Sequence, residues 1–210
     1  MLTDSDIKER LRQRLSGSQP SLPGEATFAG LPLDYSPAVR ALIPTDPVRA
    51  AVLVPVVDRP EGLTVLMTER ASGLRQHGGQ ISFPGGRIEP GDAGPREAAL
   101  RETFEEIGLH ARAVDVLGFL SDSLIGTGYC ITPVVGLVRL DAPLVCDPLE
   151  VASVFEIPLA RILDPTQHHV RTRPLAGHQI DFHEFEFDGH RVWGATAGLL
   201  IKLYRLLIEV

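Results

Sequence analysis

One helix in the middle of the chain most constrains the fold, because the sequence marks both of its ends. Residues 95–107 begin with Pro95, whose fixed φ and missing N–H suit the first position of a helix. Gly108 follows the last helical residue and provides a C-terminal stop. Apolar runs of strand-like composition lie on both sides of this segment. The sequence therefore predicts a helix at 95–107 that β-strands precede and follow along the chain.

The apolar runs predict the strands individually. Residues 50–57 and 63–68 are separated by Asp58-Arg59-Pro60-Glu61-Gly62, which has the composition of a hairpin loop. Further strands are expected at 80–83, 114–120, 131–140 and 151–157, with a hairpin at Asp188-Gly189, an opening helix at 3–15 and a closing helix at about 195–208. This order predicts an α/β (α+β) fold, in which a mixed β-sheet is sandwiched between helices.

The domain organisation follows from the positions of proline and glycine. Eight of these residues interrupt the segment between 20 and 47, which excludes long regular elements there. We therefore expect residues 1–47 to form an N-terminal helix and an irregular arm packed on the body, and residues 48–210 to form the main domain. A chain of 210 residues is long enough to bury a substantial core.

Composition argues against several kinds of partner. The formal net charge is −7, whereas binding along a nucleic acid depends on accumulated Lys and Arg. No apolar run approaches the roughly 20 residues that span a bilayer, and residues 1–15 lack the apolar stretch of a signal peptide. Cys130 and Cys146 have no metal-type spacing and fit a reducing compartment. We expect a cytoplasmic protein with neither a nucleic-acid nor a membrane partner.

The central helix carries an unusual group of carboxylates. At about 100° per residue, one face is predicted to pack, and it consists of Leu100, Thr103, Phe104 and Ile107. The opposite face consists of Arg101, Glu102, Glu105 and Glu106. The like charges three and four residues apart cost the helix a few tenths of a kcal/mol per pair. A solvated acidic face is one interpretation; the other is a site for a hard divalent cation, which prefers oxygen ligands.

A second feature lies upstream of this helix. The strand at 80–83 runs into Phe83-Pro84-Gly85-Gly86, where the glycines permit positive φ and close approach of the backbone. A plain tight turn would have the same composition. Arg70, Arg75 and His77 precede this turn, and such cationic donors suit phosphate groups. Ordinary surface arginines are the equally simple alternative.

Taken together, Gly86, Asp92 and residues 101–109 resemble the signature box of the Nudix hydrolase superfamily. The chain departs from the usual box in having Asp92 where a glutamate stands, one additional residue before Arg101, and Thr103 in place of an aliphatic residue. The resemblance implies a Nudix fold and a Mg²⁺ or Mn²⁺ cofactor. It leaves the role of Asp92 open.

The box and its helical spacing predict roles for the acidic residues. Glu102 and Glu106 lie one turn apart on the same face and are expected to bind the metal, with Glu105 completing or adjoining that site. Arg101 is expected to orient Glu105 across one turn. In this superfamily the base that activates water lies on the helix or in a distant loop, so Glu105 and Glu150 are both candidates. Glu150 is alternatively a surface residue at the start of a strand.

The segment 66–86 resembles the additional motif of the coenzyme A pyrophosphatase branch, as do 150–159 and 192–197. This resemblance implies hydrolysis of coenzyme A or acyl-coenzyme A to 3′,5′-ADP and 4′-phosphopantetheine, a small-molecule nucleotide substrate and a possible homodimer. The alternatives are a Nudix pyrophosphatase for NADH or ADP-ribose and a non-catalytic regulatory module that binds nucleotides. A module of that kind is expected to lose box carboxylates, whereas all three are present here.

Overall fold

The computed structural model describes residues 2–21, 27–28, 45–73, 78–175 and 178–209. Its main sheet has the strand order β1-β7-β8-β2-β3-β4, and β5, β6 and β9 pair with β2, β8 and β3 respectively. The strands of this sheet are β1 (Thr27–Phe28), β2 (Val48–Arg59), β3 (Gly62–Arg70), β4 (Ile81–Ser82), β5 (Gly85–Arg87), β6 (Val114–Phe119), β7 (Ser123–Ile125), β8 (Tyr129–Val138) and β9 (Val151–Pro158).

A smaller antiparallel sheet and the helices complete the described fold. The smaller sheet contains β10 (His169–Leu175), β11 (His178–Phe187) and β12 (His190–Trp193). The helices are α1 (Asp4–Leu15), α3 (Pro95–Ile107), α4 (Leu159–Ile162) and α5 (Gly194–Ile208), with 3-10 turns η1 (Ala111–Ala113) and η2 (Pro165–Gln167). Within the described part of the chain, no helix has the length and apolar character needed to cross a membrane.

The main sheet is mixed, as the sequence predicts. Its central strands β2 and β8 run parallel, in register from Val48 opposite Tyr129 to Val57 opposite Val138. The pairs β2–β3, β3–β9 and β6–β8 are antiparallel. The predicted hairpin loop joins β2 to β3, where Arg59 pairs with Gly62.

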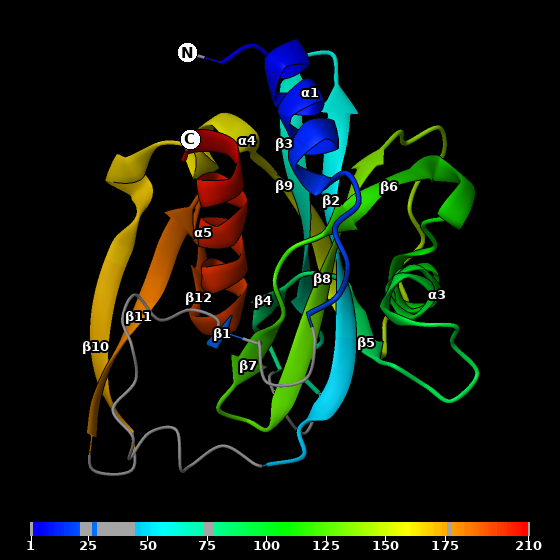
Figure 1. The fold of residues 1–210 in the computed structure, drawn as a ribbon. Coiled ribbons are helices and arrows are strands. Elements are labelled where there is room, and N and C mark those ends of the chain that lie inside the picture. Colours follow the sequence, from blue (N-terminus) through cyan, green and yellow to red (C-terminus); the bar gives the residue numbers. More distant parts are fainter. Residues whose placement is uncertain (1, 22–26, 29–44, 74–77, 176–177, 210) are drawn as a thin grey trace.

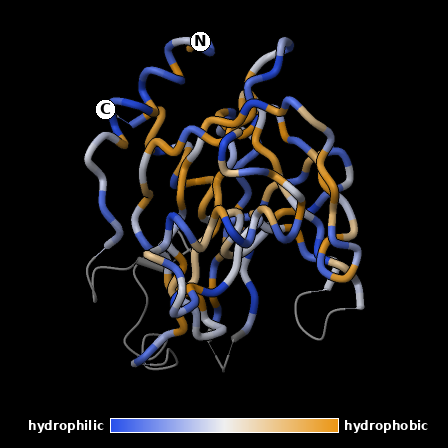
Figure 2. Tube along the Cα trace, turned by 90° about the vertical axis from the view of Figure 1, so that its right-hand side faces the viewer, coloured by the Kyte–Doolittle hydropathy of each residue, from blue (hydrophilic) through white to orange (hydrophobic). Residues whose placement is uncertain are grey.

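Helices cover both faces of this sheet, which confirms the predicted layers. Figure 1 shows α3 on one side and α1 with α5 on the other. Alternate residues of β2 enter different cores: Val52 and Val54 join the core that contains α1 and α5, whereas Ala51 and Leu53 join the core that contains α3. The most hydrophobic segments accordingly gather in the interior (Figure 2). The sheet therefore holds α3 in place through a packed apolar face.

Some elements were not predicted, because their own residues do not specify them. Strand β5 is Gly-Gly-Arg and has no apolar period, and it forms through its ladder with Ala50–Val52 of β2. Strand β10 is rich in polar residues and contains Pro174, and it is aligned by β11. The division at residue 47 remains a prediction, since 22–26 and 29–44 lie outside the described residues; α1 itself shares a core with α5.

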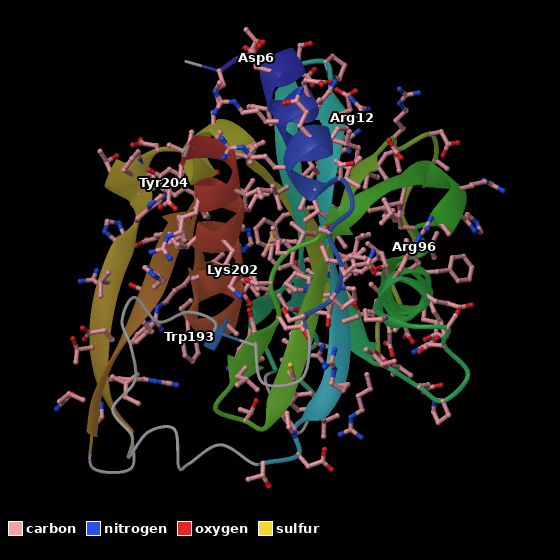
Figure 3. All side chains as sticks on the ribbon, in the orientation of Figure 1. Asp6, Arg12, Arg96, Trp193, Lys202 and Tyr204 are labelled. Carbon is pink, nitrogen blue, oxygen red and sulfur yellow. The ribbon has the colours of Figure 1, made fainter. Side chains whose placement is uncertain are left out.

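A polar contact also ties α5 to the main sheet. Lys202 is on the side of α5 that faces the sheet (Figure 3). Its ammonium group donates to the carbonyl oxygens of Ser121 and Asp122 at 2.8 and 3.1 Å, and to Ser123 Oγ at 2.6 Å. Burial lowers the pKa of Lys202 to about 8.

Candidate active site

The turn between β4 and β5 requires glycine for steric reasons. Gly85 has φ of 145°, and a Cβ at this position would lie 2.3 Å from the carbonyl oxygen of Ala51. A Cβ on Gly86 would lie 2.5 Å from Oε2 of Glu102. The predicted close approach of the backbone is therefore present, and it brings β5 against the carboxylates of α3.

Helix α3 begins and ends as predicted, but its buried face is rotated from the expected one. Ala98, Ala99 and Thr103 are fully buried, and the Thr103 hydroxyl donates to the carbonyl oxygen of Ala99 at 2.6 Å. The prediction that Phe104 packs is wrong, since this residue is 47% exposed. The prediction that Glu106 lies on the open face is also wrong, since it is only 3% exposed. Small alanine side chains let the helix lie close to the sheet through the face that includes Glu106.

Glu106 is the most strongly perturbed carboxylate of the site. The backbone N–H of Gly85 donates to its Oε2 at 3.0 Å, and Nη1 of Arg70 lies 3.7 Å from its Oε1. Burial raises the pKa of Glu106 to about 7, and the charges of Glu150 and Glu102 act in the same direction. A carboxylate in this environment is stabilised in its ionised form by a nearby cation.

Glu102 and Glu105 flank this buried group. Glu102 is half-buried against Gly86, and burial raises its pKa, while the neighbouring Arg101 acts in the opposite direction. The side chain of Glu105 is 57% exposed. Arg101 Nη1 donates to Glu102 Oε1 and to Glu105 Oε2, in both cases at 3.0 Å. The predicted contact of Arg101 with Glu105 across one turn is present; its catalytic importance remains a prediction.

Asp92, whose role the sequence left open, is the main partner of Arg101. Arg101 donates from Nε and Nη2 to the two carboxylate oxygens of Asp92, both at 3.0 Å, and also from Nη2 to the carbonyl oxygen of Arg87 at 3.1 Å. The Arg101 side chain holds the pKa of Asp92 below its usual value, together with the N–H of Glu89. This bidentate geometry fixes the guanidinium next to the carboxylates. The spacing of the box alone does not reveal the pairing.

The loop before β9 brings Glu150 to the same region. Asp147 N–H donates to the carbonyl oxygen of Glu106 at 2.9 Å, so this loop lies against the end of α3. The backbone N–H of Ala71, the residue after Arg70, donates to the carbonyl oxygen of Glu150 at 2.8 Å. Glu150 is exposed, and its charge contributes to the raised pKa values of both Glu102 and Glu106. Arg70 and Glu150 are thus placed beside the helix carboxylates, while Arg75 and His77 lie outside the described residues.

The donor atoms of the site suit a hard divalent cation. Glu102 and Glu106 present carboxylate oxygens in a partly desolvated environment, and Mg²⁺ and Mn²⁺ prefer such ligands. Among the described residues, no three acidic, histidine or cysteine side chains already converge on one point. Glu105 is turned towards Arg101 instead. The burial of the Glu106 carboxylate near that of Glu102 favours a cation here, because a cation offsets the repulsion of the desolvated carboxylates.

Comparison with known proteins agrees with this arrangement. The NUDIX domain family model matches residues 47–173. A protein of Cronobacter sakazakii, described as uncharacterized Nudix hydrolase NudL, is 45% identical over 160 residues, which cover 74% of this chain and 80% of the relative. A Yersinia pestis protein with the same description is 40% identical over 155 residues, covering 74% of this chain and 77% of the relative.

Solved structures share the fold. The crystal structure of DR0079 from Deinococcus radiodurans superposes with a TM-score of 0.50 at 18% identity, covering 75% of this chain and 83% of that one. The family model and the relatives make the chain a hydrolase that acts on pyrophosphate bonds. The chain belongs to the Nudix family, because the family model matches more than half of its length. Enzymes of this family generally use a divalent cation and bind small-molecule nucleotides.

Proposed function

We propose that this Nudix hydrolase cleaves the pyrophosphate bond of coenzyme A or an acyl-coenzyme A. Water adds to one phosphorus and the bridging oxygen leaves, giving 3′,5′-ADP and 4′-phosphopantetheine. The observation that carries this proposal is the position of the described residues of segment 66–86, a segment that resembles the motif of the coenzyme A pyrophosphatase branch. Its residue Arg70 lies 3.7 Å from Glu106, and its Gly85 donates to the same carboxylate.

The helix carboxylates would hold the cation. In this proposal Glu102 and Glu106 are the principal ligands, and Glu105 completes or adjoins the site. When bound, a divalent cation lowers the pKa of a coordinated water and neutralises charge on the pyrophosphate oxygens. Arg101, fixed by Asp92, keeps Glu105 in position rather than contacting substrate.

Two residues are candidates for the base that takes a proton from the attacking water. Glu105 is exposed and hydrogen-bonded to Arg101, which fixes its orientation. Glu150 is exposed on the loop that lies against the end of α3. Changing the true base to glutamine should lower kcat and leave cation affinity nearly intact, whereas changing a ligand should weaken both. Parallel measurements on Glu105→Gln and Glu150→Gln therefore separate the two roles.

Cationic and backbone donors would bind the phosphates of the substrate. The guanidinium of Arg70 lies near the carboxylates, with Nη1 3.7 Å from Oε1 of Glu106. In this proposal its other N–H groups donate to the pyrophosphate. Gly85 and Gly86 keep the backbone close to the site, which a side chain at either position would obstruct. Arg75 and His77 are assigned to the same role through the resemblance of their segment.

A substrate panel tests this proposal. Coenzyme A, an acyl-coenzyme A, NADH, ADP-ribose and an oxidised nucleoside triphosphate are incubated with Mg²⁺ or Mn²⁺, and the products are separated by chromatography. We expect 3′,5′-ADP from the coenzyme A compounds, and loss of most of the turnover in Glu106→Gln. Much faster cleavage of NADH, ADP-ribose or the triphosphate would refute the substrate assignment while leaving the family assignment intact. Nucleotide binding without turnover under any divalent cation would indicate the regulatory module instead.

The cellular context and assembly belong to the same proposal. Cys130 and Cys146 are free thiols, which agrees with a reducing, cytoplasmic location. A homodimer is proposed from the family resemblance alone. Light scattering over a range of protein concentrations measures the mass in solution directly, and a monomer mass at all concentrations would refute the dimer.

A further inference from the structure

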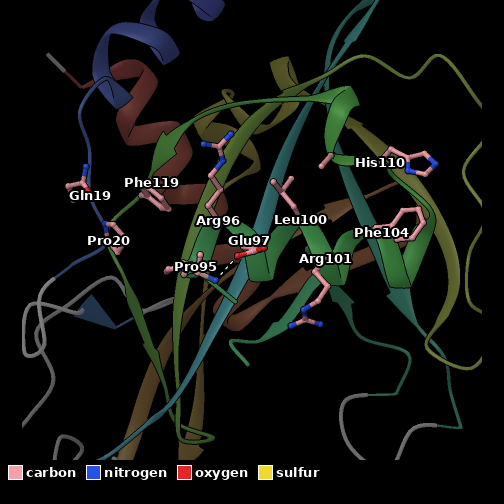
Figure 4. A pocket seen from close by; sticks show the side chains of 13 residues that line it. Gln19, Pro20, Pro95, Arg96, Glu97, Leu100, Arg101, Phe104, His110 and Phe119 are labelled. Atoms are coloured by element: carbon pink, nitrogen blue, oxygen red, sulfur yellow. Dashed lines mark hydrogen bonds between the residues drawn. The ribbon is translucent and has the colours of Figure 1, made fainter. Parts of the chain in front are cut away.

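A hollow of about 780 Å³ lies beside α3 (Figure 4), and Glu106 is not among the residues that line it. The first turns of the helix form one wall, residues 19–20 and Phe119 of β6 form another, and His110 with Ala111 closes the end. Its volume falls within the range of about 300–1,000 Å³ that small-molecule sites occupy. Neither membership of the Nudix family nor the proposed metal site gives this hollow a function.

The walls of the hollow are mainly apolar and aromatic. Leu100, Phe104 and Phe119 contribute side chains to it, as does Pro20. Phe104 remains 47% exposed, and its ring lies 4.7 Å from the ring of His110 with an interplanar angle of 34°. Removing exposed apolar surface from water is favourable, so a ligand that covers a large aromatic residue in a concave apolar surface gains binding free energy. The rotation of α3 that buries Glu106 is also what exposes Phe104 here.

One cation in the hollow is free to bind a ligand. The charge of Arg101 is engaged by Asp92, Glu102 and Glu105. Glu97 accepts the N–H of Ala93 at 2.5 Å. Among the described residues, Arg96 has no ion pair or hydrogen bond, and its guanidinium extends between Phe119 and Leu100 (Figure 4).

We propose that this hollow binds a nucleoside monophosphate. The adjacent rings of Phe104 and His110, at one end of the hollow, offer faces on which a base stacks. The planar guanidinium of Arg96 offers a bidentate donor for the phosphate, in a site whose walls are mainly apolar. Cleavage of a nucleoside diphosphate derivative releases a nucleoside monophosphate, and cleavage of coenzyme A releases its 3′-phosphorylated form, 3′,5′-ADP, so the enzyme meets a nucleotide with a 5′-phosphate whichever derivative is its substrate. The inference therefore does not depend on coenzyme A.

The test uses the full chain and adenosine 5′-monophosphate as the probe, titrated by calorimetry in the presence of a chelator. Without a divalent cation, the carboxylates of Glu102 and Glu106 repel a phosphate, so binding at the catalytic centre is suppressed. We expect saturable binding at one site. Arg96→Ala should weaken this binding about tenfold or more, since a charge-assisted bidentate contact is lost. Phe104→Ala should weaken it several-fold, and Arg96→Lys should retain part of the affinity.

Matched controls make the result specific to the hollow. Arg112→Ala removes an exposed arginine of η1 that does not line the hollow, and Glu106→Gln changes the catalytic centre. Arg112→Ala should bind the probe as the wild type does, and Glu106→Gln, which removes one of the two repelling carboxylates, should bind it no more weakly. Thermal unfolding confirms that each variant is folded, which is expected for the exposed Arg96 and Phe104. The proposal is overturned by absence of binding to the wild type, by unchanged binding to Arg96→Ala, or by loss of binding in Glu106→Gln.

Discussion

Replacing Gly86 by alanine tests whether Glu102 acts from the position that the structure gives it. A Cβ at residue 86 would lie 2.4 Å from Cδ, 2.5 Å from Oε2 and 2.6 Å from Oε1 of Glu102. Gly86 is not among the glycines with positive φ, so its backbone conformation accepts alanine. The substitution therefore acts on one carboxylate, and Glu102 must move.

The size of this movement sets the expected effect. Non-bonded carbon atoms prefer separations of about 3.5 Å or more, so the carboxylate must retreat by about 1 Å. A displacement of that size in a catalytic group costs up to about 100-fold in rate. The expected loss in kcat/KM is therefore about 10-fold to 100-fold, accompanied by weaker cation binding. The free energy of unfolding should change by less than about 1 kcal/mol, because only the end of a flexible side chain is displaced.

Gly91→Ala is the matched control for this substitution. A Cβ at residue 91 would have no neighbour within 4 Å, and Gly91 is not among the positive-φ glycines. Steady-state kinetics at limiting and saturating Mg²⁺, with cation affinity from calorimetry, compare the two variants. Wild-type kcat/KM and cation affinity in Gly86→Ala would refute the role of Glu102. Equal losses in both variants would show that alanine acts by disturbing the backbone of this segment and not by displacing the carboxylate of Glu102.

Three further substitutions test other parts of the structure. Glu106→Gln should remove most activity and weaken cation binding, since it leaves the acceptor for Gly85 N–H but removes the charge; wild-type turnover at low Mg²⁺ would contradict the carboxylate-helix mechanism. Asp92→Asn should lower activity about tenfold by loosening Arg101, and an unchanged rate would show that the other contacts of Arg101 suffice. Burial lowers the pKa of Lys202 from 10.5 to about 8. Between these two pH values the unfolded chain therefore binds more protons than the folded chain, and the free energy of unfolding rises with pH. Urea unfolding should show this rise, on the order of 1 kcal/mol after screening by solvent, in the wild type but not in Lys202→Met; equal pH dependence in both would disprove it.

The sequence alone determined the features that depend on local geometry. The limits of α3 follow from Pro95 and Gly108, because a fixed φ and a left-handed cap are properties of single residues. The carboxylates of the helix and their spacing are equally local. The main strands followed from composition and period, since β-branched residues in short apolar runs favour a buried sheet. These observations sufficed to predict the layers, and the resemblance of the box to the Nudix signature predicted the family.

The tertiary structure decided which of the carboxylates is buried. Glu105 and Glu106 are neighbours in sequence, yet Glu105 is exposed whereas Glu106 is only 3% exposed. The difference depends on which face of α3 meets β2 and β5, and Ala98 and Ala99 define that face through their small size. The helical period places residues on faces, but it does not say how closely each face approaches a neighbour.

Only the folded chain brings together residues that no periodic pattern relates. Asp92 lies in the loop before α3 and pairs with Arg101 because the loop folds back against the helix. Arg70 at the end of β3 reaches Glu106, because the sheet sets the end of that strand beside the helix. Hydrophobic period and residue spacing determine the elements of this protein, whereas the pKa of Glu106, the partner of Arg101 and the hollow beside Arg96 follow from burial and contact, which exist only once those elements pack.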